Sequence, residues 1–206
     1  MTQIGLRIGD IKGATGSAYC ELNGSKVFAA VYGPIEPENQ QVTNTAIVEC
    51  AVENAWNSKE NLENIQHKLL HTFSSTICLS SYSKTLIRIA ITIISPGALL
   101  SDAATLAGSL ALLDAGIEMV DFVVSCTVGW IDNKFQQFQS SNYCVRVAIM
   151  PSKTSIVETE VIGHIAPEDD QSGDHSLDAA IEEAIAGCKQ LHQTVHQFIS
   201  SNLTKQ

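Results

Sequence analysis

The sequence predicts an α+β fold in which mixed sheets are layered with helices, and three observations lead to this prediction. Strand-like segments with alternating or β-branched apolar residues fill most of the first third of the chain. Later segments place their apolar residues at helical spacing instead. The resulting order, ββββαβα followed by βββα, contains no linker-like composition, so residues 1–206 are interpreted as a single domain.

The first four strands are predicted from alternation and from turn residues. Ile4–Ile8 alternates apolar with other residues. Ser17–Leu22 and Lys26–Tyr32 flank Asn23-Gly24, a pair that favours a tight hairpin because both residues accept a positive φ. Thr45–Val52 is the fourth strand, and the sheet formed by the last three of these strands has edges that need cover or a partner.

The remaining elements follow from changes of period. Ser58–Cys78 and Ser101–Ala115 are predicted helices, and Gly116 suits a left-handed C-cap after the second. Four more strands are predicted from β-branched residues at Leu86–Ile94, Phe122–Val128, Tyr143–Met150 and Ser155–Ile162. A long final helix is amphipathic, with an apolar face made of Leu177, Ile181, Ile185, Cys188, Leu191, Val195, Phe198 and Ile199.

Composition and charge exclude several classes of protein. The 45% of apolar residues excludes general disorder. The formal net charge of −10 predicts weak non-specific binding of nucleic acid, because phosphate contacts need clustered Lys and Arg. No apolar run approaches the roughly 20 residues of a membrane span, and no signal peptide is expected at the N-terminus.

The cysteines and histidines predict neither a metal site nor a cofactor. The six cysteines are spread singly without a C-x-x-C pair, which is typical of reduced, packed cysteines in an intracellular protein. Cys188, His192 and His196 are spaced four apart on the final helix, but Cys188 belongs to its apolar face. His67 and His71 lack the intervening Glu of the H-E-x-x-H motif and are interpreted as surface residues.

Several short motifs together resemble the RNase PH family. Gly16-Ser17-Ala18, Lys26-Val27 and the run Val31–Pro37 are similar to the family's G-S-A, T-K-V and V-x-G-P-x-E, and Ala111–Ile117 is similar to A-L-x-D-A-G-I. The resemblance implies an RNase PH fold, like domain 2 of ribosomal protein S5. It also implies a ring of six such subunits around an RNA channel. Within the family, the chain looks most like a small ring subunit of the eukaryotic RNA exosome.

The same resemblance implies that the catalytic machinery is degenerate. Active members cleave RNA by phosphorolysis and need a phosphate-binding Thr-Arg pair and carboxylates. Leu100-Ser101 stands where the family has Thr-Arg, and Asp102, which follows, would repel phosphate. The family's catalytic carboxylates lie on the strands equivalent to Gln136–Met150, and no Asp or Glu occurs in the wider stretch between Asp132 and Glu158. We therefore expect no catalytic residue and no cofactor.

The predicted function is that of a non-catalytic exosome ring subunit, present in nucleus, nucleolus and cytoplasm. It would support 3′–5′ RNA processing and degradation, including that of rRNA, by assembly and RNA guidance. The implied partners are other RNase PH-like ring subunits, S1/KH cap proteins and RNA. For the isolated chain, a homodimer is an alternative assembly. Lys59 and Lys84 are candidate RNA contacts, or plain surface lysines. The alternatives are an active phosphate-dependent exoribonuclease and a metal-dependent nuclease using the acidic segment Pro167–Asp174.

Overall fold

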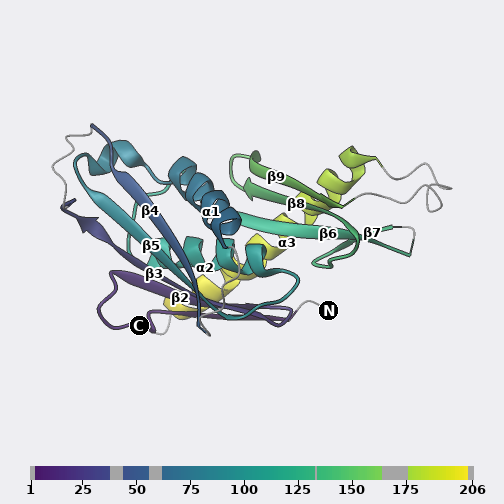
Figure 1. Cartoon of the computed structure of the whole chain (residues 1–206), viewed down its shortest axis with the longest axis horizontal. Helices are drawn as coiled ribbons and strands as arrows, with labels where there is room; N and C mark the ends of the chain where they lie inside the picture. Colours follow the sequence, from purple (N-terminus) through teal and green to yellow (C-terminus); the bar gives the residue numbers. More distant parts are fainter. Residues whose placement is uncertain (1–2, 38–43, 56–61, 133, 164–175, 204–206) are drawn as a thin grey trace. The chain divides into compact units, whose positions relative to one another are not determined.

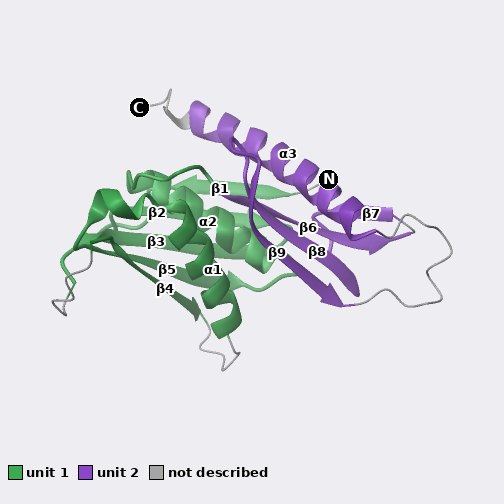
Figure 2. Ribbon diagram, turned by 90° about the horizontal axis from the view of Figure 1, so that it is seen from above, with its two compact units in different colours: residues 1–122 green, residues 123–206 purple. Residues whose placement is uncertain are grey.

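The computed structural model describes residues 3–37, 44–55, 62–132, 134–163 and 176–203. The chain divides into two compact units, residues 1–122 and residues 123–206, coloured separately in Figure 2. Each unit contains one sheet and at least one helix packed on it, so the predicted α+β class is confirmed. That the whole chain acts as a single domain stays a prediction.

Unit 1 contains a five-stranded mixed sheet in the order β1-β2-β3-β5-β4. Four of its strands, β1 (Ile4–Ile8), β2 (Gly16–Leu22), β3 (Ser25–Ile35) and β5 (Leu86–Ser95), are antiparallel neighbours. The fifth, β4 (Ile47–Asn54), runs parallel to β5. The hairpin strands and β4 lie in one sheet, as the sequence predicts, but β5 lies between β3 and β4, so β4 pairs with β5 and not with the hairpin.

Local turn residues produce the predicted hairpin and helix end. Asn23 and Gly24 both have positive φ, 44° and 85°, as the hairpin turn between β2 and β3 requires. Gly116 has a φ of 66° directly after the second helix, which confirms the left-handed C-cap.

Two helices cover one face of this sheet (Figure 1). α2 (Leu100–Asp114) packs on β2 and β3, and α1 (Glu63–Thr76) packs on β4; the short η1 (Leu79–Tyr82) follows α1. Gly108 lets the helices approach closely, because a Cβ there would overlap the Phe73 ring. The inner face of the sheet is almost fully buried, with Ala18, Cys20, Leu22, Val27, Ala29, Val31, Ile87, Ile89, Ile91 and Ile93 at its centre.

The two motifs of unit 1 that are farthest apart in the sequence contact each other in the fold. Gly16 lies against the last turn of α2, where a Cβ would overlap the backbone of Ala115. The backbone N–H of Ser17 donates to Oδ2 of Asp114 over 2.9 Å. Both motifs therefore join β2 to α2 and have a structural role.

Unit 2 contains a four-stranded antiparallel sheet covered by one helix. Its order is β7-β6-β8-β9, and α3 (Leu177–Leu203) packs on β6, β7 and β8. The strands are β6 (Val124–Ile131), β7 (Lys134–Gln137), β8 (Tyr143–Met150) and β9 (Ser155–Gly163). No described helix has the length and apolar character that a membrane crossing requires.

Two details of unit 2 differ from the prediction. The first strand begins at Val124 instead of Phe122. β7 was not predicted, because its four residues are mostly polar and show no alternation; it forms by pairing with β6, where Phe135 lies opposite Trp130. Every residue of β8 except Tyr143 is buried, as is typical of a strand whose apolar residues lie on both faces.

Candidate functional site

The predicted degenerate phosphate site lies at the start of α2. Leu100, Ser101 and Asp102 form its first turn, and Leu99 at the N-cap makes no side-chain capping bond. A helix start attracts anions, because its N–H groups are unpaired and carry the positive end of the helix dipole. Asp102 is fully buried and brings its own carboxylate to this turn. The helix start is thus supplied with a negative charge by the chain itself.

The charge of Asp102 acts on its surroundings in unit 1. The pKa of the Cys20 thiol on β2 is raised to about 12, mainly by burial and next by the nearby carboxylate of Asp102. A second negative charge, such as that of a phosphate ion, would be repelled by the same carboxylate. The electrostatics of this turn therefore oppose the phosphate binding that phosphorolysis requires.

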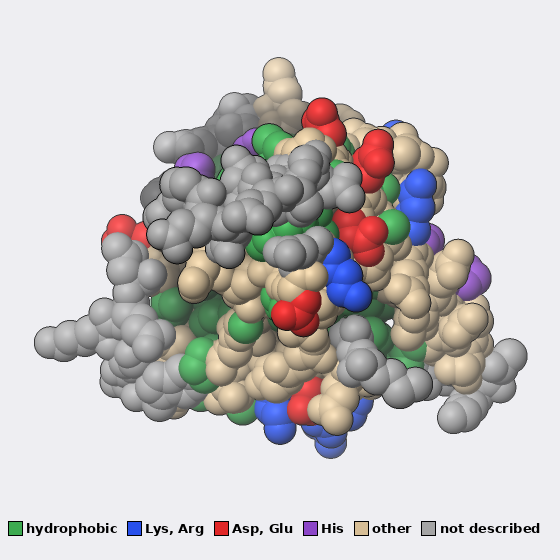
Figure 3. Space-filling model, turned by 90° about the vertical axis from the view of Figure 1, so that its right-hand side faces the viewer, with side chains coloured by type: hydrophobic (Ala, Val, Ile, Leu, Met, Phe, Trp, Pro, Cys, Tyr) green, Lys and Arg blue, Asp and Glu red, His purple; other side chains and the backbone are tan. Residues whose placement is uncertain are grey.

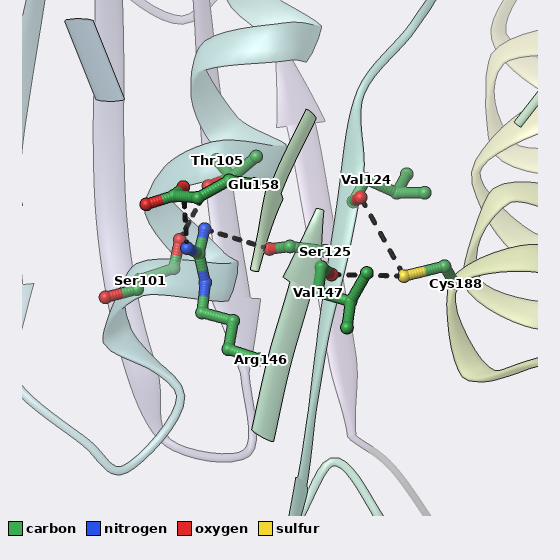
Figure 4. Close-up of polar contacts among 8 residues, drawn as sticks. All are labelled: Ser101, Thr105, Val124, Ser125, Arg146, Val147, Glu158 and Cys188. Carbon is green, nitrogen blue, oxygen red and sulfur yellow. Dashed lines mark hydrogen bonds and ion pairs between the residues drawn. The ribbon is translucent and has the colours of Figure 1, made fainter. Parts of the chain in front are cut away.

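The strands of unit 2 carry an ion pair where the family would place catalytic carboxylates. Arg146 on β8 contacts Glu158 on β9 with 3.0 Å between Nη1 and Oε2 (Figure 4). Its Nη2 donates to Oγ of Ser125 on β6 over 3.4 Å. The side chains of Arg146 and Glu158 are only 3% and 15% exposed. Arg146 therefore holds Oε2 of Glu158 in a charge-assisted hydrogen bond and competes for this oxygen with any metal ion or leaving group.

Sequence reasoning did not single out Arg146, although a signal was present. An arginine inside the apolar run of Tyr143–Met150 needs a buried partner, because an unpaired charge is costly in a protein interior. The register places Glu160 directly opposite Arg146, and Arg146 also forms an ion pair diagonally with Glu158. In the described part of the chain, β7 and β8 contain neither Asp nor Glu.

The residues weighed for a metal site do not come together. Cys188 points into the sheet, where its thiol lies 3.5 Å from the carbonyl oxygen of Val147 and 3.8 Å from that of Val124 (Figure 4). The rings of His192 and His196 have centroids 6.5 Å apart. No cluster of three potential metal ligands occurs among the residues that the structure describes.

Of the two lysines predicted to contact RNA, the structure describes one. Lys84 is exposed in the turn between η1 and β5, with a φ of 61°. Lys59 and the acidic segment Pro167–Asp174 lie outside the described residues. On the face of the molecule in Figure 3, the described residues include both basic and acidic side chains. The role of both lysines in RNA binding stays a prediction.

Comparisons with protein families and with curated proteins both give matches. The family described as "3′ exoribonuclease family, domain 1" (RNase PH) matches residues 1–118. Among curated proteins, the exosome complex component Rrp41 of Thermococcus kodakarensis is 32% identical over 98% of this chain and 85% of its own length. The Rrp41 of Thermococcus gammatolerans is 29% identical over 100% of this chain and 86% of its own length.

Solved structures share the fold at lower sequence identity. Rice (Oryza sativa) Rrp46 is similar with a TM-score of 0.79 and 18% identity, covering 93% of this chain and 91% of that one. The Archaeoglobus fulgidus exosome with RNA bound to its active site has a chain similar at a TM-score of 0.75 and 16% identity, covering 95% of this chain and 89% of that one. The predicted RNase PH fold is confirmed, and because the family match spans more than half of the sequence, the chain belongs to the 3′ exoribonuclease (RNase PH) family.

Proposed function

We propose that this chain is a non-catalytic subunit of an exosome-type ring, and that it supports 3′–5′ RNA processing by assembly and RNA guidance. Its curated relatives are exosome components that match it over nearly its full length. Chains of solved exosome cores have the same fold. In this proposal its partners are other RNase PH-like subunits, with S1/KH proteins as caps, in the nucleus, nucleolus and cytoplasm.

One observation carries the non-catalytic part of the proposal. Phosphorolysis needs a bound phosphate and a carboxylate near the leaving oxygen. β7 and β8 provide no carboxylate in their described residues, and Glu158 on β9 is held by Arg146. At the start of α2, the carboxylate of Asp102 opposes a phosphate ion. Both halves of the required chemistry are therefore missing from these elements.

The first prediction is that the chain enters a ring with RNase PH-like subunits but adds no phosphorolytic activity. The purified chain is mixed with such subunits and passed over a sizing column, and each fraction is incubated with labelled single-stranded RNA, Mg²⁺ and inorganic phosphate. We expect co-elution, and no phosphate-dependent release of nucleoside diphosphates by the chain alone.

Three outcomes would contradict this proposal. A chain that co-elutes with no RNase PH-like subunit contradicts the assembly. Nucleoside diphosphate release that co-purifies with the chain and changes in an Asp102→Asn variant supports the active alternative. RNA cleavage that needs a divalent metal but no phosphate supports the metal-dependent alternative.

The second prediction concerns RNA guidance by Lys59 and Lys84. Each lysine that contacts a phosphate adds a sequence-independent contribution to binding, which salt weakens. In the assembled ring, changing both to Ala is expected to reduce crosslinking to RNA and to flatten the dependence of log affinity on log salt by about one unit per lost contact. Lys153→Ala, at an exposed turn of unit 2, is the matched control. Unchanged crosslinking and salt slope would show that both lysines only solubilise the surface.

A further inference from the structure

One edge of the sheet in unit 2 lacks the usual protection against pairing with another chain. β9 is the last strand in the order β7-β6-β8-β9, so one side of its backbone pairs with none of the described strands. Proteins normally protect such an edge by keeping it short or by placing lysine or proline on it. β9 is nine residues long and contains neither lysine nor proline.

The other three sheet edges differ from β9 in length and in exposed side chains. β1, β4 and β7 have five, eight and four residues. Among the described residues, the exposed large apolar side chains include none from these three strands but three from β9. They are Ile156, Val161 and Ile162, which are 46%, 48% and 46% exposed. Exposed β-branched residues on a long open edge are typical of a strand that pairs with another chain.

A bulge near the start of β9 limits the stretch that can accept a partner. The register with β8 shifts at Val157, which packs inward against a small apolar cluster of unit 2. Beyond the bulge, Glu158–Gly163 pairs with β8 without a further shift. A bulge interrupts pairing, so an added strand is expected along these last six residues of β9.

The side chains of this stretch define what a partner strand must offer. Neighbouring residues of a strand point to opposite faces, so Val161 and Ile162 expose apolar surface on both faces of the edge. Glu160, two residues from Ile162, shares its face. Together β8 and β9 carry the carboxylates of Glu158 and Glu160 but a single cation, Arg146, so this part of the sheet has a negative charge.

These features favour a polypeptide over a nucleic acid. The edge of a strand is matched by another extended backbone, which offers donors and acceptors at the same spacing. The phosphates of RNA would meet the two carboxylates, whereas the side chain of Arg146 is only 3% exposed and cannot reach them. A second copy pairing through β9 would bring Glu158 and Glu160 of both copies together, and like charges across a strand pair are unfavourable.

We propose that β9 binds an extended segment of a different protein, which pairs antiparallel with Glu158–Gly163 as an added strand. Antiparallel pairing is slightly more stable per residue than parallel pairing. The segment carries β-branched residues opposite Val161 and Ile162, and charge complementarity sets a lysine or arginine opposite Glu160. The inference goes beyond the proposed function and uses no property of the family, so its failure would leave ring assembly untouched.

Fluorescence anisotropy of a labelled peptide tests the proposal on the full chain. The probe is the capped hexapeptide Thr-Val-Val-Lys-Thr-Val, whose two adjacent valines lie opposite Ile162 and Val161 and whose lysine lies opposite Glu160 in antiparallel register. Val161→Lys is expected to weaken binding about tenfold, because a charge replaces the apolar contact on the edge. A probe with Glu in place of Lys is expected to bind about fivefold more weakly, and Glu160→Gln to remove most of this difference.

Two further probes test whether the backbone of the peptide makes the contact. Each carries N-methyl groups on alternate residues, one on the odd and one on the even positions. Alternate N–H groups of a strand point to opposite sides, so only one of these probes loses the donors that face β9. We therefore expect one N-methylated probe to lose binding and the other to retain it.

Leu177→Lys is the matched control, because Leu177 at the start of α3 is 44% exposed, close to the 48% of Val161. It is expected to leave binding unchanged, and circular dichroism checks that each variant folds. A wild-type chain that binds no probe up to its solubility limit overturns the proposal. So does binding that Val161→Lys leaves unchanged or that both N-methylated probes retain. Self-association or RNA binding that Val161→Lys abolishes would assign the edge to a second copy or to RNA instead.

Discussion

Replacing Arg146 by Met is expected to lower the free energy of unfolding by about 3–5 kcal/mol, the typical cost of removing one partner of a buried ion pair. The variant leaves the carboxylate of Glu158 with little access to water, since only 15% of that side chain is exposed. It also removes the donor to Ser125 on β6, so three strands lose a common contact. Urea unfolding followed by circular dichroism measures the loss.

The chain offers a matched control in Arg88→Met. Arg88 and Glu49 form an ion pair with the same 3.0 Å between nitrogen and oxygen, but their side chains are 46% and 50% exposed. Exposed pairs contribute about 0–1 kcal/mol, so this variant should lose no more than that. An equal loss for both variants would show that burial does not decide the strength of the Arg146–Glu158 pair.

A double variant separates the pair's attraction from the cost of leaving one charge unpaired. Arg146→Met combined with Glu158→Leu removes both charges, and replacing a whole buried pair by apolar residues is often neutral. We expect it to be more stable than Arg146→Met alone. The cycle is completed by Glu158→Leu alone. If the stability losses of the two single variants simply add up to that of the double variant, the two side chains do not act as a pair.

Gly16→Ala is expected to destabilise the fold by about 3 kcal/mol, at the upper end of the cost of overpacking. The added Cβ would overlap the backbone nitrogen of Ala115 and lie 2.5 Å from the carbonyl oxygen of Ala111. These are backbone atoms of α2 and cannot rotate away, so β2 and α2 must separate. Separation would also stretch the hydrogen bond from Ser17 to Asp114. Thermal unfolding measures the effect.

Gly5→Ala is the control for this substitution. Gly5 lies on the neighbouring strand β1, and its added Cβ would meet only the side chain of Glu21, at 3.4 Å or more. Surface changes of this kind usually shift stability by no more than about 0.5 kcal/mol. A Gly16→Ala variant as stable as Gly5→Ala would mean that β2 and α2 are not closely packed.

The two family motifs therefore report on packing and not on catalysis. Gly16 and Ser17 contact the end of α2, and Asp114 accepts the hydrogen bond that joins them. A chain can keep these motifs and the fold while it loses catalytic carboxylates elsewhere. For this reason motif resemblance identifies the family, whereas activity must be argued from the residues of the site.

The sequence by itself determined the elements whose signals are local. Asn23-Gly24 placed the hairpin and Gly116 ended α2, because a positive φ is a property of the residue and its turn. A continuous run of apolar and β-branched residues located Tyr143–Met150 to the residue, and the absence of Asp and Glu between Asp132 and Glu158 was readable without any structure.

Only the tertiary structure decided the contacts that depend on strand order and register. It placed β5 between β3 and β4, formed β7 by pairing alone, and joined Arg146 to Glu158, which lies diagonally across the hairpin. The regular stretch of β9 beyond its bulge also exists only once that strand is in register with β8. The physical reason is that turns and periodicity are set by neighbouring residues, whereas pairing joins residues far apart in the chain, and each choice of register brings a different set of side chains together.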